Sequence, residues 1–157
     1  MVEQSIPPRI LVVDDDDLID AIFEAALPKL GLPAAVRVAD GTDAVALLDD
    51  GQVFDVIFTD IYMPQMDGIE LLQHLAKTGY PGAVILMTGV DFIRMLQDNG
   101  LDAPVTVDPE TNSVTLNREG LFGEGEDVNL VHTMGKPFQL ADLAAAMTSA
   151  GWPVSTD

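Results

Sequence analysis

The chain has 157 residues, of which 48% are apolar and 6% aromatic, and its 26 acidic against 7 basic side chains give a formal net charge of -19 at pH 7. This length and apolar content fit one compact domain with a hydrophobic core, and the absence of cysteine excludes disulfides, thiolate metal sites and cysteine catalysis. The charge opposes direct binding to nucleic acid or to an anionic membrane, because both carry charge of the same sign.

Five short apolar segments alternate with segments of helical periodicity. The apolar segments, which we predict as strands, are residues 10–13, 35–39, 53–59, 83–87 and 129–134. Apolar residues at helical spacing follow them within residues 18–26, 44–48, 69–75, 92–96 and 140–147. We expect the first helix to end or bend just before Pro28, whose ring removes a backbone donor. The alternation predicts an α/β fold with a parallel sheet covered by helices on both faces.

One stretch between the fourth helix and the last strand interrupts this alternation. Residues 104–107 (PVTV) and 113–116 (SVTL) flank the polar turn DPETN and predict a β-hairpin. Residues 117–127 (NREGLFGEGED) are acidic and glycine-rich, which favours a mobile loop over a phosphate cradle. We therefore expect a single domain over residues 1–157, with an insertion at about 101–128.

Carboxylates stand at the ends of two predicted strands. Asp60 follows the strand at 53–59 and precedes Met-Pro and Asp-Gly turn signals, and four aspartates, residues 14–17, follow the first strand. The carboxyl ends of parallel strands line one edge of a sheet, so we expect Asp14, Asp15 and Asp60 to meet there. Three carboxylates brought together would repel each other at neutral pH unless a metal cation neutralised them.

Other aspartates have a structural interpretation. Asp16 and Asp17 are expected to begin the first helix, where acidic side chains interact favourably with the positive end of the helix dipole. Asp67 with Gly68 is typical of a turn and a helix start, and we do not expect a second nucleophile there.

Four segments together resemble the receiver domains of two-component response regulators. They are ILVVDDD at 10–16, DVIFTDIYMPQMDGIELL at 55–72, VILMTG at 84–89 and GKPF at 135–138. The resemblance covers nearly the whole chain apart from the inserted hairpin. It implies a flavodoxin-like, doubly wound α/β fold, with a five-stranded parallel sheet of order 2-1-3-4-5 to which the hairpin is added.

The resemblance also implies that Asp60 is the phosphoacceptor of the domain. Asp60 would take a phosphoryl group from the phosphohistidine of a sensor histidine kinase or a histidine phosphotransfer protein, forming an acyl phosphate. Asp14, Asp15, Asp60 and the backbone carbonyl of Tyr62 would bind Mg²⁺, which prefers oxygen ligands. The domain would signal by protein contacts with a downstream target, and it would catalyse its own phosphorylation and dephosphorylation without being a turnover enzyme.

Two further residues at strand ends would act on the phosphoryl group. By the same resemblance, the Lys136 ammonium pairs with it and the Thr88 hydroxyl donates a hydrogen bond to it. Pro137 is expected to follow a cis peptide bond, a conformation that is accessible mainly before proline.

The chain departs from the family at several positions. Thr133 stands where receivers usually carry an aromatic switch residue, so the usual aromatic switch is in doubt. Tyr62 and Val90 occupy positions that, in the family this chain resembles, flank the route of attacking water, which predicts a long-lived phosphoryl group. The insertion falls on the face that receivers use for output, where it could form a partner contact or a homodimer interface, or be a tolerated surface loop.

Two other functions remain as alternatives. A haloacid-dehalogenase-type, Mg²⁺-dependent phosphatase would use Asp14 and Asp16 as its D-x-D motif, but this interpretation leaves the Asp60 segment unexplained. A receiver-like interaction module that is never phosphorylated is the second alternative, and the complete set of site residues argues against it. The first residues, MVEQSIPPR, contain no apolar signal region, so we expect a cytoplasmic protein. The net charge of -19 leads us to expect no nucleic acid or membrane partner.

Overall fold

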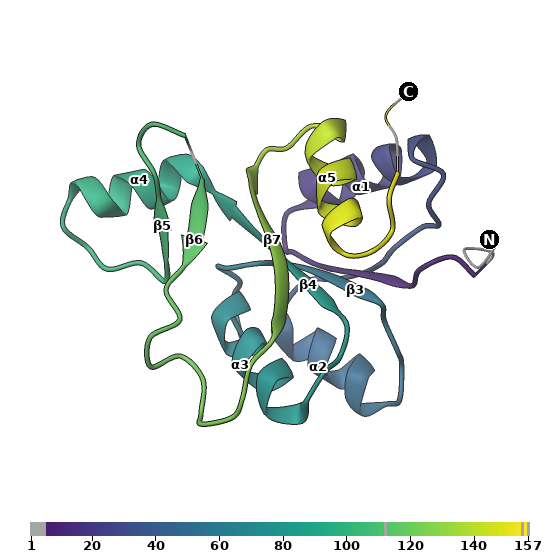
Figure 1. The fold of residues 1–157 in the computed structure, drawn as a ribbon, viewed down its shortest axis with the longest axis horizontal. Helices are drawn as coiled ribbons and strands as arrows, with labels where there is room; N and C mark the ends of the chain where they lie inside the picture. Colours follow the sequence, from purple (N-terminus) through teal and green to yellow (C-terminus); the bar gives the residue numbers. More distant parts are fainter. Residues whose placement is uncertain (1–5, 112, 155, 157) are drawn as a thin grey trace.

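The computed structural model describes residues 6–111, 113–154 and 156 and shows a parallel sheet between two layers of helices (Figure 1). Five strands form the sheet in the order β2-β1-β3-β4-β7. They are β1 (Ile10–Val13), β2 (Val36–Val38), β3 (Val56–Asp60), β4 (Ala83–Gly89) and β7 (Asn129–Lys136). All four pairings are parallel, so the predicted order is confirmed, with β7 as the fifth strand of the sheet.

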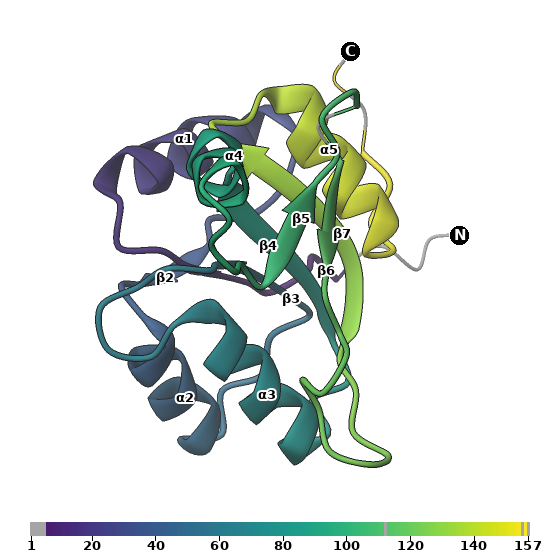
Figure 2. The ribbon, with the colours of Figure 1, turned by 90° about the vertical axis from the view of Figure 1, so that its left-hand side faces the viewer.

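Helices cover both faces of this sheet. They are α1 (Asp17–Lys29), α2 (Gly41–Asp49), α3 (Gly68–Thr78), α4 (Val90–Asp98) and α5 (Leu140–Ser149). Figures 1 and 2 show α1 and α5 on one face and α2 and α3 on the other. The core accordingly divides into two clusters, one with Phe23 and Leu143 and one with Leu71 and Leu75. Strands β1 and β3 are buried along their whole length, which explains the apolar sequence of β1 and of residues 56–58 in β3.

Aspartates begin α1 and α3, as the sequence predicts. Asp16 is the N-cap of α1, and its side chain accepts a hydrogen bond from the backbone N–H of Leu18. Asp67 caps α3 in a capping box with Glu70, in which each side chain accepts from the backbone of the other residue. These contacts satisfy donors that a helix start leaves unpaired.

The predicted end of α1 is wrong. The helix continues through Pro28 to Lys29. Proline removes only one donor, and the backbone N–H groups of Leu30 and Leu32 close the last turn by donating to Leu27 O at 3.1 and 3.0 Å. Leu27 and Leu30 are both buried, so packing of this turn outweighs the effect of the proline.

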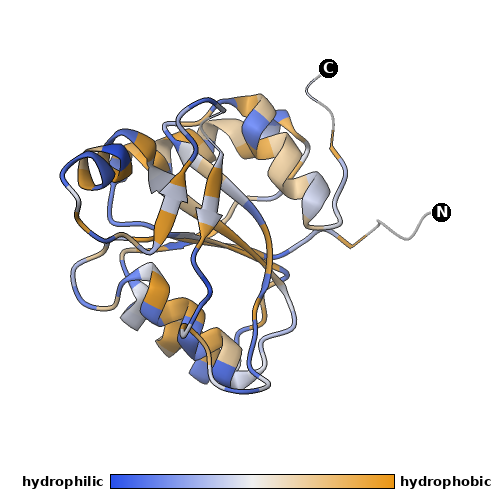
Figure 3. Ribbon diagram, turned by 60° about the vertical axis from the view of Figure 1, so that its left-hand side comes forward, coloured by the Kyte–Doolittle hydropathy of each residue, from blue (hydrophilic) through white to orange (hydrophobic). Residues whose placement is uncertain are grey.

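The insertion contains the predicted hairpin. Strands β5 (Val105–Val107) and β6 (Val114–Leu116) pair antiparallel and form a separate two-stranded sheet. The side chain of Gln97 on α4 accepts from Val107 N at 2.8 Å and donates to Val107 O at 3.4 Å. Figure 3 shows that hydrophobic and polar residues alternate in the hairpin strands, and the buried side chains of Val105, Val107 and Leu116 join the core.

The segment after the hairpin forms turns without a helix or strand up to β7. Leu121 and Phe122 pack against the core cluster of α3, and Gln73 Nε2 donates to Leu121 O at 2.9 Å. This acidic loop is therefore anchored on α3, and its mobility stays a prediction. Within the described part of the chain, no helix has the length and apolar character required to cross a membrane.

Candidate functional site

Three carboxylates meet at the carboxyl ends of β1 and β3. Asp14, Asp15 and Asp60 each place one carboxylate oxygen within 4.8 Å of the others. The parallel pairing of β1 with β3 puts the two strand ends side by side. Asp14 and Asp60 are 1% and 6% exposed, whereas Asp15 is exposed. The juxtaposition predicted from the sequence is confirmed, and the donor set matches the preference of Mg²⁺ for oxygen ligands with water completing the shell.

Lys136 reaches these carboxylates from the end of β7. Its Nζ lies 3.0 Å from Oδ2 of Asp14 and 3.0 Å from Oδ2 of Asp60. The peptide bond between Lys136 and Pro137 is cis, as predicted. One ammonium group therefore neutralises part of the charge of two buried acids.

Burial and the neighbouring charges together set the pKa values of these groups. Burial and, next to it, the nearby charge of Asp14 raise the pKa of Asp60 to about 6 against the opposing effect of Lys136. Burial also raises the pKa of Asp14. Burial lowers the pKa of Lys136, but its hydrogen bond to Asp14 and the charge of Asp60 outweigh this effect, so the pKa is raised. Full ionisation of these carboxylates therefore costs free energy unless a cation binds beside them.

Backbone donors orient the two buried carboxylates. Asp14 Oδ1 accepts from the N–H of Asp16 at 2.8 Å, and Asp60 Oδ1 accepts from the N–H of Ile61 at 2.8 Å. In each carboxylate, therefore, Oδ1 is held by the local backbone while Oδ2 faces Lys136.

Thr88, at the end of β4, carries a buried hydroxyl with no partner. The residue is 1% exposed, and its Oγ1 has no hydrogen bond to any described residue. A buried polar atom of this kind is costly and is uncommon in native structures. A ligand at the site would give the hydroxyl a partner. The next residue, Gly89, has only Phe92 Cβ within 4 Å of an added Cβ, so the backbone beside Thr88 is open.

Tyr62 and Val90 flank the site on the side of α4. The Tyr62 side chain is 41% exposed, and its ring packs edge-on against Phe92 with centroids 5.2 Å apart. Val90 is the first residue of α4, and its Cγ2 would lie 2.6 Å from a Cβ on Gly135. The role of the Tyr62 carbonyl as a metal ligand stays a prediction.

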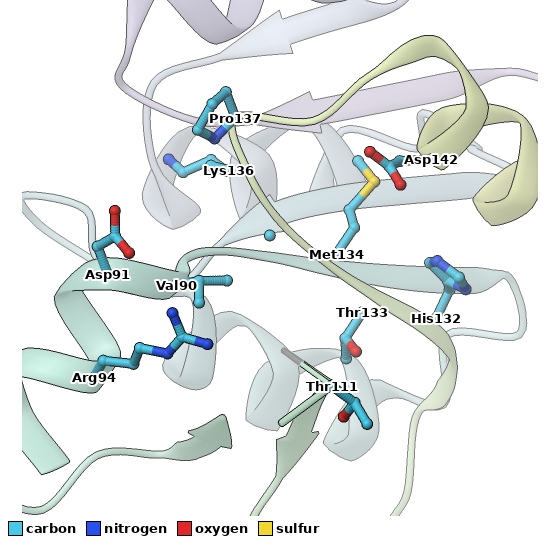
Figure 4. Close-up of a pocket in the computed structure, with 11 residues that line it drawn as sticks. Val90, Asp91, Arg94, Thr111, His132, Thr133, Met134, Lys136, Pro137 and Asp142 are labelled. Atoms are coloured by element: carbon cyan, nitrogen blue, oxygen red, sulfur yellow. The ribbon is translucent and has the colours of Figure 1, made fainter. Parts of the chain in front are cut away.

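A cavity of about 460 Å³ lies beside the site, between α4, β7 and α5 (Figure 4). Asp91 and Arg94 line it from α4, Thr133 and Lys136 from β7, and Asp142 from α5. The clustered carboxylates do not line it, so Lys136 connects two neighbouring regions of the surface.

The sequence does not predict the contacts that two threonine side chains make. Thr59 Oγ1 donates to the backbone carbonyl of Asp60 at 2.9 Å, and Thr133 Oγ1 donates to Val114 O of the hairpin at 2.7 Å. A hydroxyl in the otherwise apolar run before Asp60 was the only available signal for Thr59. The contact of Thr133 joins segments whose relative position the sequence does not determine.

Comparison with known proteins agrees with the geometry. A family model described as the response regulator receiver domain matches residues 10–103, and the match ends before the hairpin and β7. Cyclic di-GMP phosphodiesterase RocR of Pseudomonas aeruginosa is 27% identical over 140 residues, which cover 89% of this chain and 30% of that protein. Uncharacterized transcriptional regulatory protein YrkP of Bacillus subtilis is 30% identical over 137 residues, covering 87% and 46%. The chain spans less than half the length of these relatives.

Solved structures show the same fold at low sequence identity. The receiver domain of Francisella response regulator 1452 has a TM-score of 0.58 and 23% identity, with 92% of this chain and 97% of that chain covered. Vibrio cholerae chemotaxis protein CheY4 has a TM-score of 0.62 and 21% identity, with 92% and 99% covered. The family match over most of the sheet, together with this fold, assigns the chain to the response regulator receiver domain family.

Proposed function

We propose that Asp60 is the residue of this phosphoacceptor response regulator that receives the phosphoryl group. The observation that supports this most strongly is the placement of a buried Asp60 carboxylate between Lys136 and the acidic pair Asp14 and Asp15. The pKa of Asp60, raised to about 6, still leaves the carboxylate mostly ionised at neutral pH, as a nucleophile requires.

Asp14, Asp15 and Asp60 are the side chains that would hold Mg²⁺, with the Tyr62 carbonyl as a neutral ligand. Their oxygens lie within 4.8 Å of one another. Burial raises the pKa of Asp14 and of Asp60, so a bound cation would favour the ionised form of both carboxylates. When bound, Mg²⁺ would offset the negative charge of the transferring phosphoryl group.

In the proposed reaction, a carboxylate oxygen of Asp60 attacks the phosphorus of a phosphohistidine. The new O–P bond forms as the P–N bond breaks, and the imidazole, which carries a proton on its other ring nitrogen, leaves with the electron pair as neutral histidine. Lys136 keeps its proton and pairs with the phosphoryl oxygens, exchanging part of its contact with Asp60 for one with the new group. The buried Thr88 hydroxyl donates to a phosphoryl oxygen, which removes the cost of its present lack of a partner.

The proposed donors are a sensor histidine kinase or a histidine phosphotransfer protein, and the proposed setting is cytoplasmic signalling through a downstream protein. The relatives include Probable histidine kinase 6 of Oryza sativa, 36% identical over 91 residues. The net charge of -19 argues against a nucleic acid or an anionic membrane as a direct partner of this domain. Autocatalysed phosphorylation and dephosphorylation belong to the same proposal.

The insertion is proposed to serve the output face. The hairpin is fastened to α4 through Gln97 and to β7 through Thr133, so it covers part of the surface between these elements. A specific partner contact or a homodimer interface would use this added surface. Deletion of residues 104–127 should abolish the contact or the dimer, and unchanged partner binding and assembly would refute this role.

The phosphatase alternative fits less well. It requires Asp16 as a reactive carboxylate, but the Asp16 side chain is exposed and caps α1 through Leu18 N at 2.9 Å. That contact gives Asp16 the structural role expected of a helix start.

The test is the intact mass of the protein after incubation with acetyl phosphate and Mg²⁺, with released phosphate measured in parallel. We expect one phosphoryl adduct that is lost in Asp60→Asn and when EDTA removes Mg²⁺. Asp49→Asn, an exposed aspartate at the end of α2, is the matched control and should be labelled normally. Sustained phosphate release without an adduct, dependent on Asp14, would instead support the phosphatase.

A further inference from the structure

The peptide between Asp60 and Ile61 is held by a buried side-chain hydroxyl. Thr59 is 0% exposed, and its Oγ1 donates to the carbonyl oxygen of Asp60 at 2.9 Å. The hydroxyl makes no other hydrogen bond with the described residues. A polar group buried this deeply in a strand requires its partner, so the contact is expected to persist.

Gly68, the first residue of α3, packs against the same peptide group. A Cβ on Gly68 would lie 2.0 Å from the carbonyl oxygen of Asp60 and 2.9 Å from Cα of Ile61. The N–H of Gly68 also donates to Ile61 O at 2.7 Å. The first residue of α3 therefore lies directly against the Asp60–Ile61 peptide and leaves it no room to rotate. Only glycine fits this close approach.

The contacts of Thr59 and Gly68 affect the Asp60 carboxylate through the rigid peptide group between Asp60 and Ile61. The carbonyl of Asp60 and the N–H of Ile61 belong to a single planar peptide group, so fixing the first fixes the direction of the second. That N–H donates to Asp60 Oδ1 at 2.8 Å, while Asp60 Oδ2 lies 3.0 Å from Lys136 Nζ. The orientation of the plane therefore determines which oxygen is held by the backbone and which faces the lysine.

We infer that Thr59 is a positioning residue for phosphorylation of Asp60, acting through the peptide plane that Gly68 supports from the other side. The inference rests on the proposed role of Asp60 and adds a residue that touches neither phosphoryl group nor metal. Small misplacements of a reacting group have large effects on rate, so loss of the hydroxyl should slow the transfer step.

The test is Thr59→Val, which keeps the size and branching of the side chain and removes the hydroxyl. At saturating Mg²⁺, the maximum rate of phosphorylation by acetyl phosphate should fall on the order of tenfold, with the half-saturating concentration of acetyl phosphate unchanged. Thr59→Ser keeps the hydroxyl and should restore most of the rate. In ¹⁵N-resolved NMR spectra, the Ile61 amide should exchange with solvent faster in Thr59→Val than in Thr59→Ser.

Thr148→Val is the matched control, because Thr148 Oγ1 also donates to a backbone carbonyl, that of Ala144, at 2.9 Å in α5. It should leave the rate unchanged. If Thr59→Val does not fold, Thr59→Cys, which has a similar size and a weak donor, should show the same slower rate.

An unchanged maximum rate in folded Thr59→Val, or a loss that Thr59→Ser does not restore, would overturn the inference and leave the role of Asp60 intact. No adduct on the wild-type protein would overturn the proposed function and this inference with it.

Discussion

Lys136 Nζ lies 3.0 Å from an oxygen of Asp60 and 3.0 Å from an oxygen of Asp14, so a single cation serves two buried carboxylates. The three groups come from the ends of β7, β3 and β1, which are distant in sequence. Removing the Lys136 ammonium should therefore affect both the stability of the protein and the chemistry at the carboxyl ends of these strands.

Replacing Lys136 with methionine tests this relationship. Without Mg²⁺ at pH 7, the free energy of unfolding should fall by about 3 kcal/mol, because two buried acids lose their counter-charge. Phosphorylation by acetyl phosphate should slow on the order of a hundredfold, the usual effect of removing one charge-stabilising group. Lys77→Met, at an exposed position in the last turn of α3, is the control and should change neither quantity. Similar values for both variants would contradict the assigned role of Lys136.

The stability of the metal-free protein should depend on pH through Asp60. Its pKa is about 6 in the folded state and 3.8 ordinarily, so between these values the folded state binds more protons than the unfolded state. The free energy of unfolding should therefore decrease as pH rises from about 4 to 6, by at most about 3 kcal/mol. Urea unfolding in EDTA measures this, and Asp60→Asn should flatten the dependence and be more stable than wild type at pH 7. Parallel curves for the two proteins would refute the assignment.

Magnesium should stabilise the fold at the carboxylate cluster. At a concentration of about 100 times its Kd, Mg²⁺ should add about 2.7 kcal/mol to the free energy of unfolding, since the unfolded chain lacks the site. Asp15→Asn, which removes the exposed member of the cluster, should weaken Mg²⁺ binding measured by titration calorimetry. Asp49→Asn should bind as wild type does, and equal weakening in both variants would point to nonspecific screening by the acidic surface.

The lifetime of the phosphoryl group should depend on the side chains that flank the site. Tyr62→Asn combined with Val90→Glu should speed hydrolysis on the order of tenfold, equivalent to about 1.4 kcal/mol in the barrier, because a polar path for water replaces the ring packed on Phe92. Loss of ³²P label over time measures the rate. Val53→Glu, at an exposed apolar position before β3, is the control, and an unchanged lifetime in the double variant would rule out shielding.

Attachment of the hairpin to β7 should depend on Thr133. Thr133→Val removes the hydrogen bond to Val114 O and should lower the free energy of local opening of the hairpin by about 1 kcal/mol. Hydrogen exchange of the β5 and β6 amides measures this opening. Thr115→Val, at an exposed position on β6, keeps the bond and should exchange as wild type does. Equal exchange in both variants would show that packing on α4 alone holds the hairpin.

Most of the helices and strands could be predicted from the periodicity of apolar residues and from the turn residues between them. The strands and the hairpin follow from apolar runs and turn residues that act locally, whereas the strand order was implied only by the resemblance to receiver domains. The meeting of Asp14 with Asp60 follows from parallel strands ending at one edge of the sheet. The end of α1 did not follow, because burial of Leu27 and Leu30 outweighed the local effect of Pro28.

The contacts of Thr59 and Thr133 could not be predicted from local patterns. The hydroxyl of Thr59 could have faced either a neighbouring strand or its own backbone, and only the folded β3 shows that it holds the Asp60 carbonyl. The contact between Thr133 and Val114 depends on how an inserted segment returns to the sheet, which neither strand propensity nor turn chemistry specifies.

The position of the hairpin has a consequence for self-association. An open sheet exposes unpaired backbone groups on its outermost strands, and such edges can recruit strands from other molecules. Here β2 is only three residues long and carries Arg37, while β7, the long outer strand, has the hairpin beside it, fastened by Thr133. We therefore expect the insertion to hinder the addition of a strand from another molecule along β7, the longer of the two outer strands.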